Sequence, residues 1–118
     1  MKLEINGKQY TFLFDYNFLK EINYKYTENS DGVPVRLGIE SIGVNILNHD
    51  IETLIEALKL ANQSQKENIS EEKLALFVGT SNTEKLFDEV VAELKKSEFV
   101  GKKFTKMMET AQKNQSKK

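Results

Sequence analysis

Several residue types are absent or nearly absent from this chain of 118 residues, and three of these shortages bear on the kinds of site it can form. The chain has no cysteine, which excludes disulfides, thiolate nucleophiles and cysteine-bound metals and fits a reducing compartment. His49 is the only histidine, so a Ser-His-Asp triad would have to use it. Arg36 is the only arginine, although arginine is the usual residue for bidentate contacts to bases and phosphates.

The other polar residues show no pattern of a catalytic, nucleotide or metal site. The glycines are scattered and form no phosphate-binding fingerprint. The acidic pairs at 71–72 and 88–89 lack the spaced oxygens and the glycine of a calcium loop, and are expected on solvated helix surfaces. His49 precedes a helix cap and is expected to face solvent. We therefore expect no enzymatic activity and no bound cofactor or metal.

Long hydrophobic runs are also missing. No apolar stretch approaches the roughly 20 residues of a membrane helix, and residues 1–5 show no secretory signal. With 39% hydrophobic and 30% charged residues, the composition is that of a globular protein. We therefore expect a soluble cytoplasmic protein with one α+β domain over residues 1–112 and a disordered basic tail over residues 113–118.

The charges that are present are distributed unevenly. Residues 1–94 carry 9 basic and 16 acidic side chains, a net charge of −7, whereas residues 95–118 carry 8 lysines and 2 glutamates, a net charge of +6. A basic end of this kind attracts nucleic acid, an acidic partner or the protein's own acidic body, and charge alone does not choose among them.

The first fourteen residues predict a β-hairpin. Leu3 and Ile5 alternate with polar residues, Asn6-Gly7 favours a turn, and alternation resumes from Tyr10 to Phe14. A turn at Asn6-Gly7 would place Leu3 opposite Tyr10, whereas a turn at Gly7-Lys8 would place Ile5 there. Both registers give the hairpin one apolar face, which must be covered by other parts of the fold or by a neighbouring subunit.

Five to six short helices are expected after this hairpin. Asp15, Asp50 and Ser70 are placed to cap three of them, and the sequence Ser81–Glu84 resembles a capping box for a fourth. Isoleucines at helical spacing predict another helix near residues 39–47, and a final helix is expected from about Ser97. Residues 27–34 contain the only proline and are expected to form a loop with a mobile tip.

Apolar stripes on the last two helices supply the candidates for partner binding. They are wide enough either to close the domain's own core or to bind another chain, and neighbouring methionines suit an adaptable surface. The candidate residues are Phe87, Val91, Leu94, Phe99, Phe104, Met107 and Met108.

The order of elements resembles the tail assembly chaperones of long-tailed bacteriophages (siphophages) of Gram-positive hosts. The resemblance lies in the hairpin with the following helix over residues 1–22, in the stretch Ile39–Ala61, and in the acidic-then-basic helix Thr83–Ser97. It covers about residues 1–100 and includes no catalytic motif.

This resemblance implies a protein that binds the tape measure protein, keeps that long chain soluble and helps recruit tail tube subunits during tail morphogenesis. It implies action in the host cytoplasm and absence from the mature virion. Family members are often made in two forms, the longer one by a ribosomal frameshift, and Lys117-Lys118 would suit such a site. Apolar stripes on many short helices also suggest self-association.

The alternative function is a small nucleic-acid-binding regulator that uses the lysine-rich C-terminal end. It predicts salt-sensitive binding that is lost when residues 95–118 are deleted. The shortage of arginine weighs against it.

Overall fold

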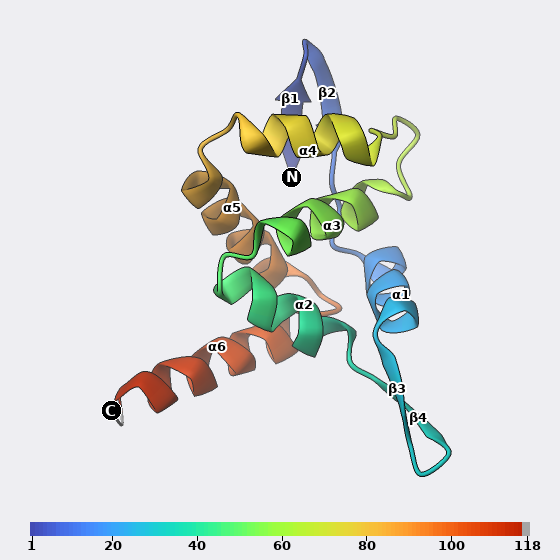
Figure 1. Ribbon diagram of the computed structural model, residues 1–118, viewed down its shortest axis with the longest axis vertical. Coiled ribbons are helices and arrows are strands. Elements are labelled where there is room, and N and C mark those ends of the chain that lie inside the picture. Colours follow the sequence, from blue (N-terminus) through green and yellow to red (C-terminus); the bar gives the residue numbers. More distant parts are fainter. Residues whose placement is uncertain (117–118) are drawn as a thin grey trace.

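Figure 1 shows the computed structural model, in which residues 1–116 are described, with side chains described through Lys113. Strands β1 (Lys2–Ile5) and β2 (Lys8–Thr11) form the expected antiparallel hairpin. Leu3 pairs with Tyr10, so the register is the one set by a turn at Asn6-Gly7. Both turn residues have positive φ, 54° and 79°, as in the type I′ turn that Asn-Gly favours.

Six helices account for most of the described chain, which confirms the predicted α+β class. They are α1 (Tyr16–Lys25), α2 (Gly38–Leu47), α3 (Ile51–Asn62), α4 (Glu71–Gly79), α5 (Thr83–Lys96) and α6 (Gly101–Ser116). The three single-residue caps are confirmed, because Asp15, Asp50 and Ser70 each accept a hydrogen bond from the backbone N–H three residues later, at 3.1–3.2 Å.

The beginning of α5 differs from the predicted capping box. Asn82 is the cap, and its side chain accepts from the backbone N–H of Lys85 at 3.2 Å. The Ser81 hydroxyl instead donates to the carbonyl of Phe77 at 2.5 Å, and Glu84 pairs with Nδ1 of His49 at 3.1 Å. Asn is as good a cap as Ser, so the neighbouring residue could take the role.

The last helix begins at Gly101, four residues later than expected. Ser97 ends α5, and its hydroxyl donates to the carbonyl of Phe14 at 2.6 Å and accepts from the backbone of Phe99 and Val100. At the other end α6 extends to Ser116, so it includes most of the segment for which a disordered tail was expected. Lys117 and Lys118, the suggested frameshift site, lie outside the described residues.

The loop expected at residues 27–34 is a second β-hairpin, made of β3 (Thr27–Ser30) and β4 (Val33–Arg36). Asp31-Gly32 forms its turn, with φ values of 51° and 79°. This Asp-Gly pair is the hairpin signal that the sequence analysis missed. All eight strand residues are exposed, and Figure 1 shows this hairpin projecting at the opposite end of the molecule from the β1–β2 hairpin.

One apolar core joins the first hairpin to the helices. Its largest fully buried side chains are Phe12, Phe18, Ile22, Ile42, Ile46, Leu54, Leu58, Ile69, Leu74, Phe87, Leu94 and Phe104. Helix α6 crosses α2 at Gly43, where an added Cβ would lie 2.8 Å from the terminal methyl of Met107. A glycine at this position therefore lets the two helices approach closely.

Candidate protein-binding surface

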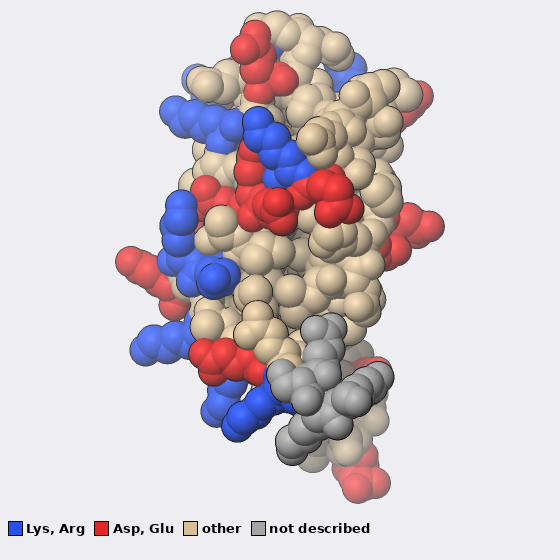
Figure 2. Space-filling model, turned by 90° about the vertical axis from the view of Figure 1, so that its left-hand side faces the viewer, with Lys and Arg blue, Asp and Glu red and all other residues tan. Residues whose placement is uncertain are grey.

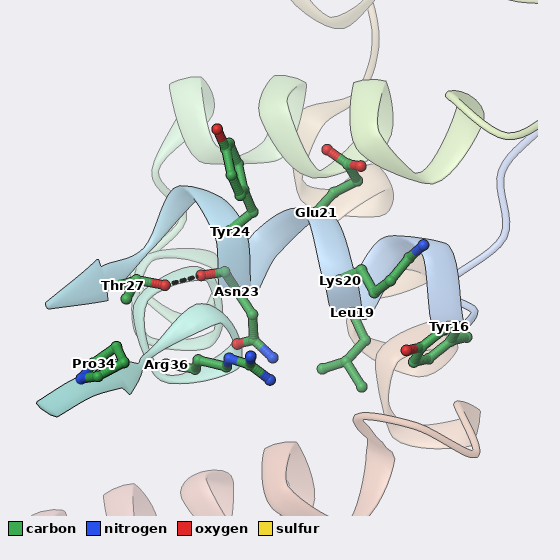
Figure 3. A pocket seen from close by; sticks show the side chains of 9 residues that line it. All are labelled: Tyr16, Leu19, Lys20, Glu21, Asn23, Tyr24, Thr27, Pro34 and Arg36. Carbon is green, nitrogen blue, oxygen red and sulfur yellow. Dashed lines mark hydrogen bonds between the residues drawn. The ribbon is translucent and has the colours of Figure 1, made fainter.

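A groove with a volume of about 630 Å³ lies between α1 and the β3–β4 hairpin (Figure 3). We call it the aromatic groove. Its lining residues are Tyr16, Leu19, Lys20, Glu21, Asn23, Tyr24, Thr27, Pro34 and Arg36. The volume is within the roughly 300–1,000 Å³ typical of ligand pockets, but the exposed hairpin leaves the groove open to solvent, as suits a protein partner.

Asn23 holds the two walls of the aromatic groove in place. Its side-chain Oδ1 accepts a hydrogen bond from the backbone N–H of Gly38 at 3.0 Å, which fixes α1 against the beginning of α2. Its carbonyl accepts from the hydroxyl of Thr27 at the first position of β3, the bond drawn in Figure 3. These two hydrogen bonds therefore fix the direction in which the hairpin extends from the end of α1.

Aromatic side chains form the exposed part of this groove. Helix α1 buries Phe18 and Ile22, which leaves Tyr16 and Tyr24 at the surface, where Tyr24 is 88% exposed. The ring of Tyr16 contacts the half-exposed ring of Phe99, with centroids 5.8 Å apart. Exposed aromatic rings that touch each other across two segments are a candidate contact for another chain.

The charges of the aromatic groove are mixed. In Figure 3, Arg36 extends along α1 toward Asn23, while Glu21 and Tyr24 point to the other side of the helix. The ammonium group of Lys20 lies 5.4 Å from the ring centre of Tyr16. Within residues 1–113, Arg36 makes no ion pair, so its guanidinium is available to a partner's carboxylate.

The seven candidates from the sequence are divided between the core and the surface. Phe87, Leu94 and Phe104 are buried, so they close the domain's own core, which was the other possibility for these stripes. Val91, Met107 and Met108 are half-buried against that core. Phe99 alone among the seven is exposed, and it lies beside the aromatic groove.

The sequence analysis missed the α1 and hairpin residues of this surface, among them Tyr16, Tyr24, Pro34 and Arg36. Tyr16 and Tyr24 do not share the apolar stripe of α1, and aromatic residues off a buried stripe are a signal that could have found them. Pro34 and Arg36 lie on β4, whose hairpin partner was expected to be part of a loop. Their position beside α1 depends on the hairpin that was not predicted.

His49 packs on the side chain of Phe87 in α5. Its φ is 57°, and its ring stacks on Phe87 with a centroid distance of 4.5 Å and an interplanar angle of 6°.

Across the described residues, no group of three or more His, Asp and Glu side chains is arranged to hold a metal ion. In the same part of the chain, none of the helices combines the length and the apolar character that crossing a membrane requires.

Comparison with known protein families finds a match for this chain. A family model described as phage tail assembly chaperone protein, TAC, matches residues 2–109. The matched region therefore runs from β1 into α6 and includes every residue of the aromatic groove and Phe99. No curated protein and no solved structure matches the chain.

Proposed function

This chain belongs to the phage tail assembly chaperone family, and from that premise we propose that it binds the tape measure protein, keeps it soluble and helps recruit tail tube subunits during tail morphogenesis. We place this activity in the host cytoplasm and expect the protein to be absent from the mature virion. It acts by reversible binding, without a catalytic residue or a cofactor.

The observation that carries the proposal is the exposed aromatic surface of α1, the β3–β4 hairpin and Phe99. Tyrosine and arginine are enriched among the residues that contribute most to protein–protein binding, and the aromatic groove contains Tyr16, Tyr24 and Arg36. A groove of this kind takes an amphipathic helix, whose apolar side contacts the rings and whose carboxylates reach Arg36. A tape measure protein, as a long helical chain, offers many such segments.

The six other candidates from the sequence are buried or half-buried, and we expect them to contribute after first contact with the client. Val91, Met107 and Met108 are near enough to the surface to extend the contact with small changes of side-chain conformation. Phe87, Leu94 and Phe104 would become available only if α6 moved away from α2 and α5. The aromatic groove needs no such movement, so we assign first contact with the client to it.

The test compares two triple variants with the same kind of change. The groove variant carries Tyr16→Ser, Tyr24→Ser and Phe99→Ser, and the control variant carries Val44→Ser, Ile51→Ser and Leu76→Ser, which are exposed apolar residues elsewhere on the molecule. We expect the groove variant to bind tape measure fragments at least about tenfold more weakly, which corresponds to about 1.4 kcal/mol, and the control to remain within about twofold.

Binding is measured by titration calorimetry, with circular dichroism to establish that both variants are folded. A folded groove variant that binds as tightly as the unmodified protein would remove the aromatic groove from the proposed function. Equal losses in both variants would show nonspecific apolar binding in place of a defined site.

A further inference from the structure

The second hairpin has strand edges that no other strand of the described chain covers. Its sheet consists of β3 and β4 alone within residues 1–116. All eight strand residues are exposed, and Figure 1 shows the hairpin projecting from the helices. An uncovered strand edge presents backbone N–H and C=O groups that can pair with a strand of another chain.

The register decides which backbone groups of β3 face outward. The N–H of Leu37 donates to the carbonyl of Tyr26 at 2.7 Å, so this pair at the base of the hairpin is hydrogen-bonded across the ladder. Hydrogen-bonded pairs alternate with pairs of the other kind in an antiparallel ladder. Thr27 and Asn29 belong to pairs of the other kind, so their N–H and C=O groups point away from β4.

The outer edge of β4 is less suited to strand addition. Pro34 is paired with Asn29, so its nitrogen takes the matching outward position on β4, and proline has no N–H to donate. Proline on an edge strand is one of the means by which proteins prevent strand addition. Strand β3 contains no proline, so an added strand pairs with β3.

The edge of β3 carries negative charge. Glu28 lies between the two outward-facing residues and Asp31 lies in the turn, and neither makes an ion pair within residues 1–113. In an antiparallel strand added to β3, the residue opposite Glu28 would form a pair without hydrogen bonds, in which the Cα atoms are only about 4.5 Å apart. Opposite charges in such a pair stabilise the contact, so a lysine or arginine fits this position.

A small groove adjoins the beginning of this edge and has a volume of about 200 Å³. Its lining residues are Lys25, Tyr26, Thr27, Glu28, Leu37 and Ser41. Burial and the hydrogen bond to Glu56 raise the pKa of Tyr26 to about 12, and the negative charges of Glu56 and Asp50 act in the same direction. Because Lys25 is already paired with Glu56 at 2.5 Å, the groove has room and a negative environment for a long basic side chain.

The charge of the whole surface also favours a basic partner. Residues 1–94 carry a net charge of −7. On the face shown in Figure 2, acidic side chains gather across the middle and also occupy the lower end, the end at which Figure 1 places the β3–β4 hairpin. A basic segment is therefore attracted to this region at long range. A second copy of β3 would instead bring its own Glu28 to this edge, and like charges oppose that pairing.

We propose that the outer edge of β3 binds an extended, basic segment of another protein by strand addition. The residues of that segment opposite Thr27 and Asn29 form the backbone hydrogen bonds, and a lysine or arginine between them faces Glu28. This inference goes beyond the proposed function, because it adds a second site for a segment of different shape. The aromatic groove takes a helix, whereas the edge of β3 takes a strand.

The first test uses backbone methylation of a synthetic peptide of about nine residues that alternates lysine with valine. With lysine opposite Glu28, the N–H groups of the valines face β3 and those of the lysines face away. We expect methylation of the valine nitrogens to weaken binding at least about tenfold, and methylation of the lysine nitrogens to change it by less than about twofold. Fluorescence anisotropy of labelled peptide at about 0.05 M salt measures binding.

The second test reverses the charge of the edge. Glu28→Lys should bind the lysine peptide at least about threefold more weakly, whereas the control Glu72→Lys, at an exposed position of α4, should remain within about 1.5-fold. A peptide with glutamate in place of lysine should show the opposite order, with tighter binding to Glu28→Lys than to the unmodified protein. Circular dichroism establishes that both variants are folded.

Several results would overturn the proposal. They are no binding of the lysine peptide by the unmodified protein, equal effects of the two methylation patterns, and equal losses in Glu28→Lys and Glu72→Lys. Dimers of the unmodified protein that the peptide dissociates would also overturn it, in favour of a second copy at this edge.

Binding of a tape measure fragment to the same proteins separates this inference from the proposed function. Glu28→Lys should bind the fragment with unchanged affinity, and the groove variant with Tyr16→Ser, Tyr24→Ser and Phe99→Ser should bind the lysine peptide with unchanged affinity. Loss of peptide binding in the groove variant would place the peptide in the aromatic groove and overturn the inference. Peptide binding by an unmodified protein that does not bind the fragment would overturn the proposed function alone.

Discussion

At the scale of single residues, Tyr26 connects three parts of the chain. Its hydroxyl donates to Glu56 of α3, its backbone N–H donates to Ile22 of α1 at 3.0 Å, and its carbonyl accepts from Leu37 at 2.7 Å, at the base of the second hairpin. Glu56 also accepts from Lys25 at 2.5 Å. Tyr26 and the carboxylate beside it therefore act together with Asn23 in positioning the hairpin relative to the helices.

Tyr26 makes stability depend on pH in the alkaline range. Its pKa is raised from 10.0 to about 12 in the folded protein, so between pH 10 and pH 12 the unfolded chain loses this proton first. The contribution of Tyr26 to the free energy of unfolding is complete below pH 10 and is lost as pH rises through this window. Discounted for partial exposure, the loss should be roughly 1 kcal/mol.

Urea unfolding at pH 9 and pH 11.5 measures this effect, with Tyr26→Phe as the comparison. The variant lacks the ionisable hydroxyl, so its free energy of unfolding should fall less between the two pH values than that of the unmodified protein. Equal decreases in both proteins would contradict the account of Tyr26.

At the scale of elements, Asn62 fixes the connection between α3 and α4 to the first hairpin. It is fully buried, and its amide nitrogen donates to the carbonyls of Thr11 at 3.0 Å and Glu67 at 2.9 Å. Its amide oxygen accepts from the backbone N–H of Ile69 at 2.9 Å. One side chain thus satisfies three backbone groups, which buried polar groups require.

Replacing this side chain should therefore be costly. Asn62→Ala leaves three backbone groups without a partner, and we expect the free energy of unfolding to fall by roughly 2 to 4 kcal/mol. Gln63→Ala, at the exposed neighbouring position, is the control and should change it by less than about 0.5 kcal/mol. Thermal and urea unfolding measure both, and a loss below about 1 kcal/mol in Asn62→Ala would contradict the role assigned to it.

The sequence predicted those elements whose signals are local. Asp15, Asp50 and Ser70 mark helix starts because a cap acts within three residues, and Asn6-Gly7 marks the first hairpin, although two registers were left open until the structure showed Leu3 opposite Tyr10. The second hairpin was missed because its strands bury no residue, so they lack the alternation of apolar and polar residues that identifies a strand.

The aromatic groove could not be predicted in the same way. It requires Tyr16 to meet Phe99, which is 83 positions further along the chain, and it requires the β3–β4 hairpin to fold beside α1. From the sequence alone, the apolar stripes of α5 and α6 were compatible with either a place in the core or a binding surface. Only their packing decided that Phe87, Leu94 and Phe104 are buried while Phe99 is exposed.

At the scale of the whole molecule, the described chain is a flat body with extents of 45 × 37 × 23 Å and a hairpin at each end (Figure 1). The aromatic groove is built from different residues than two smaller grooves, one at the junction of α5 and α6 and one between α3 and α4. A partner bound in the aromatic groove would therefore leave the other two grooves open.

The most direct measurement of this account is whether the protein prevents a tape measure protein from aggregating. The client is diluted from denaturant, and light scattering is followed with increasing amounts of the unmodified protein, of the groove variant, or of the control variant. We predict that the unmodified and control proteins suppress scattering in proportion to their ratio to client, and that the groove variant does not. Scattering that is the same with the unmodified protein as with an equal amount of an unrelated protein would contradict the central claim.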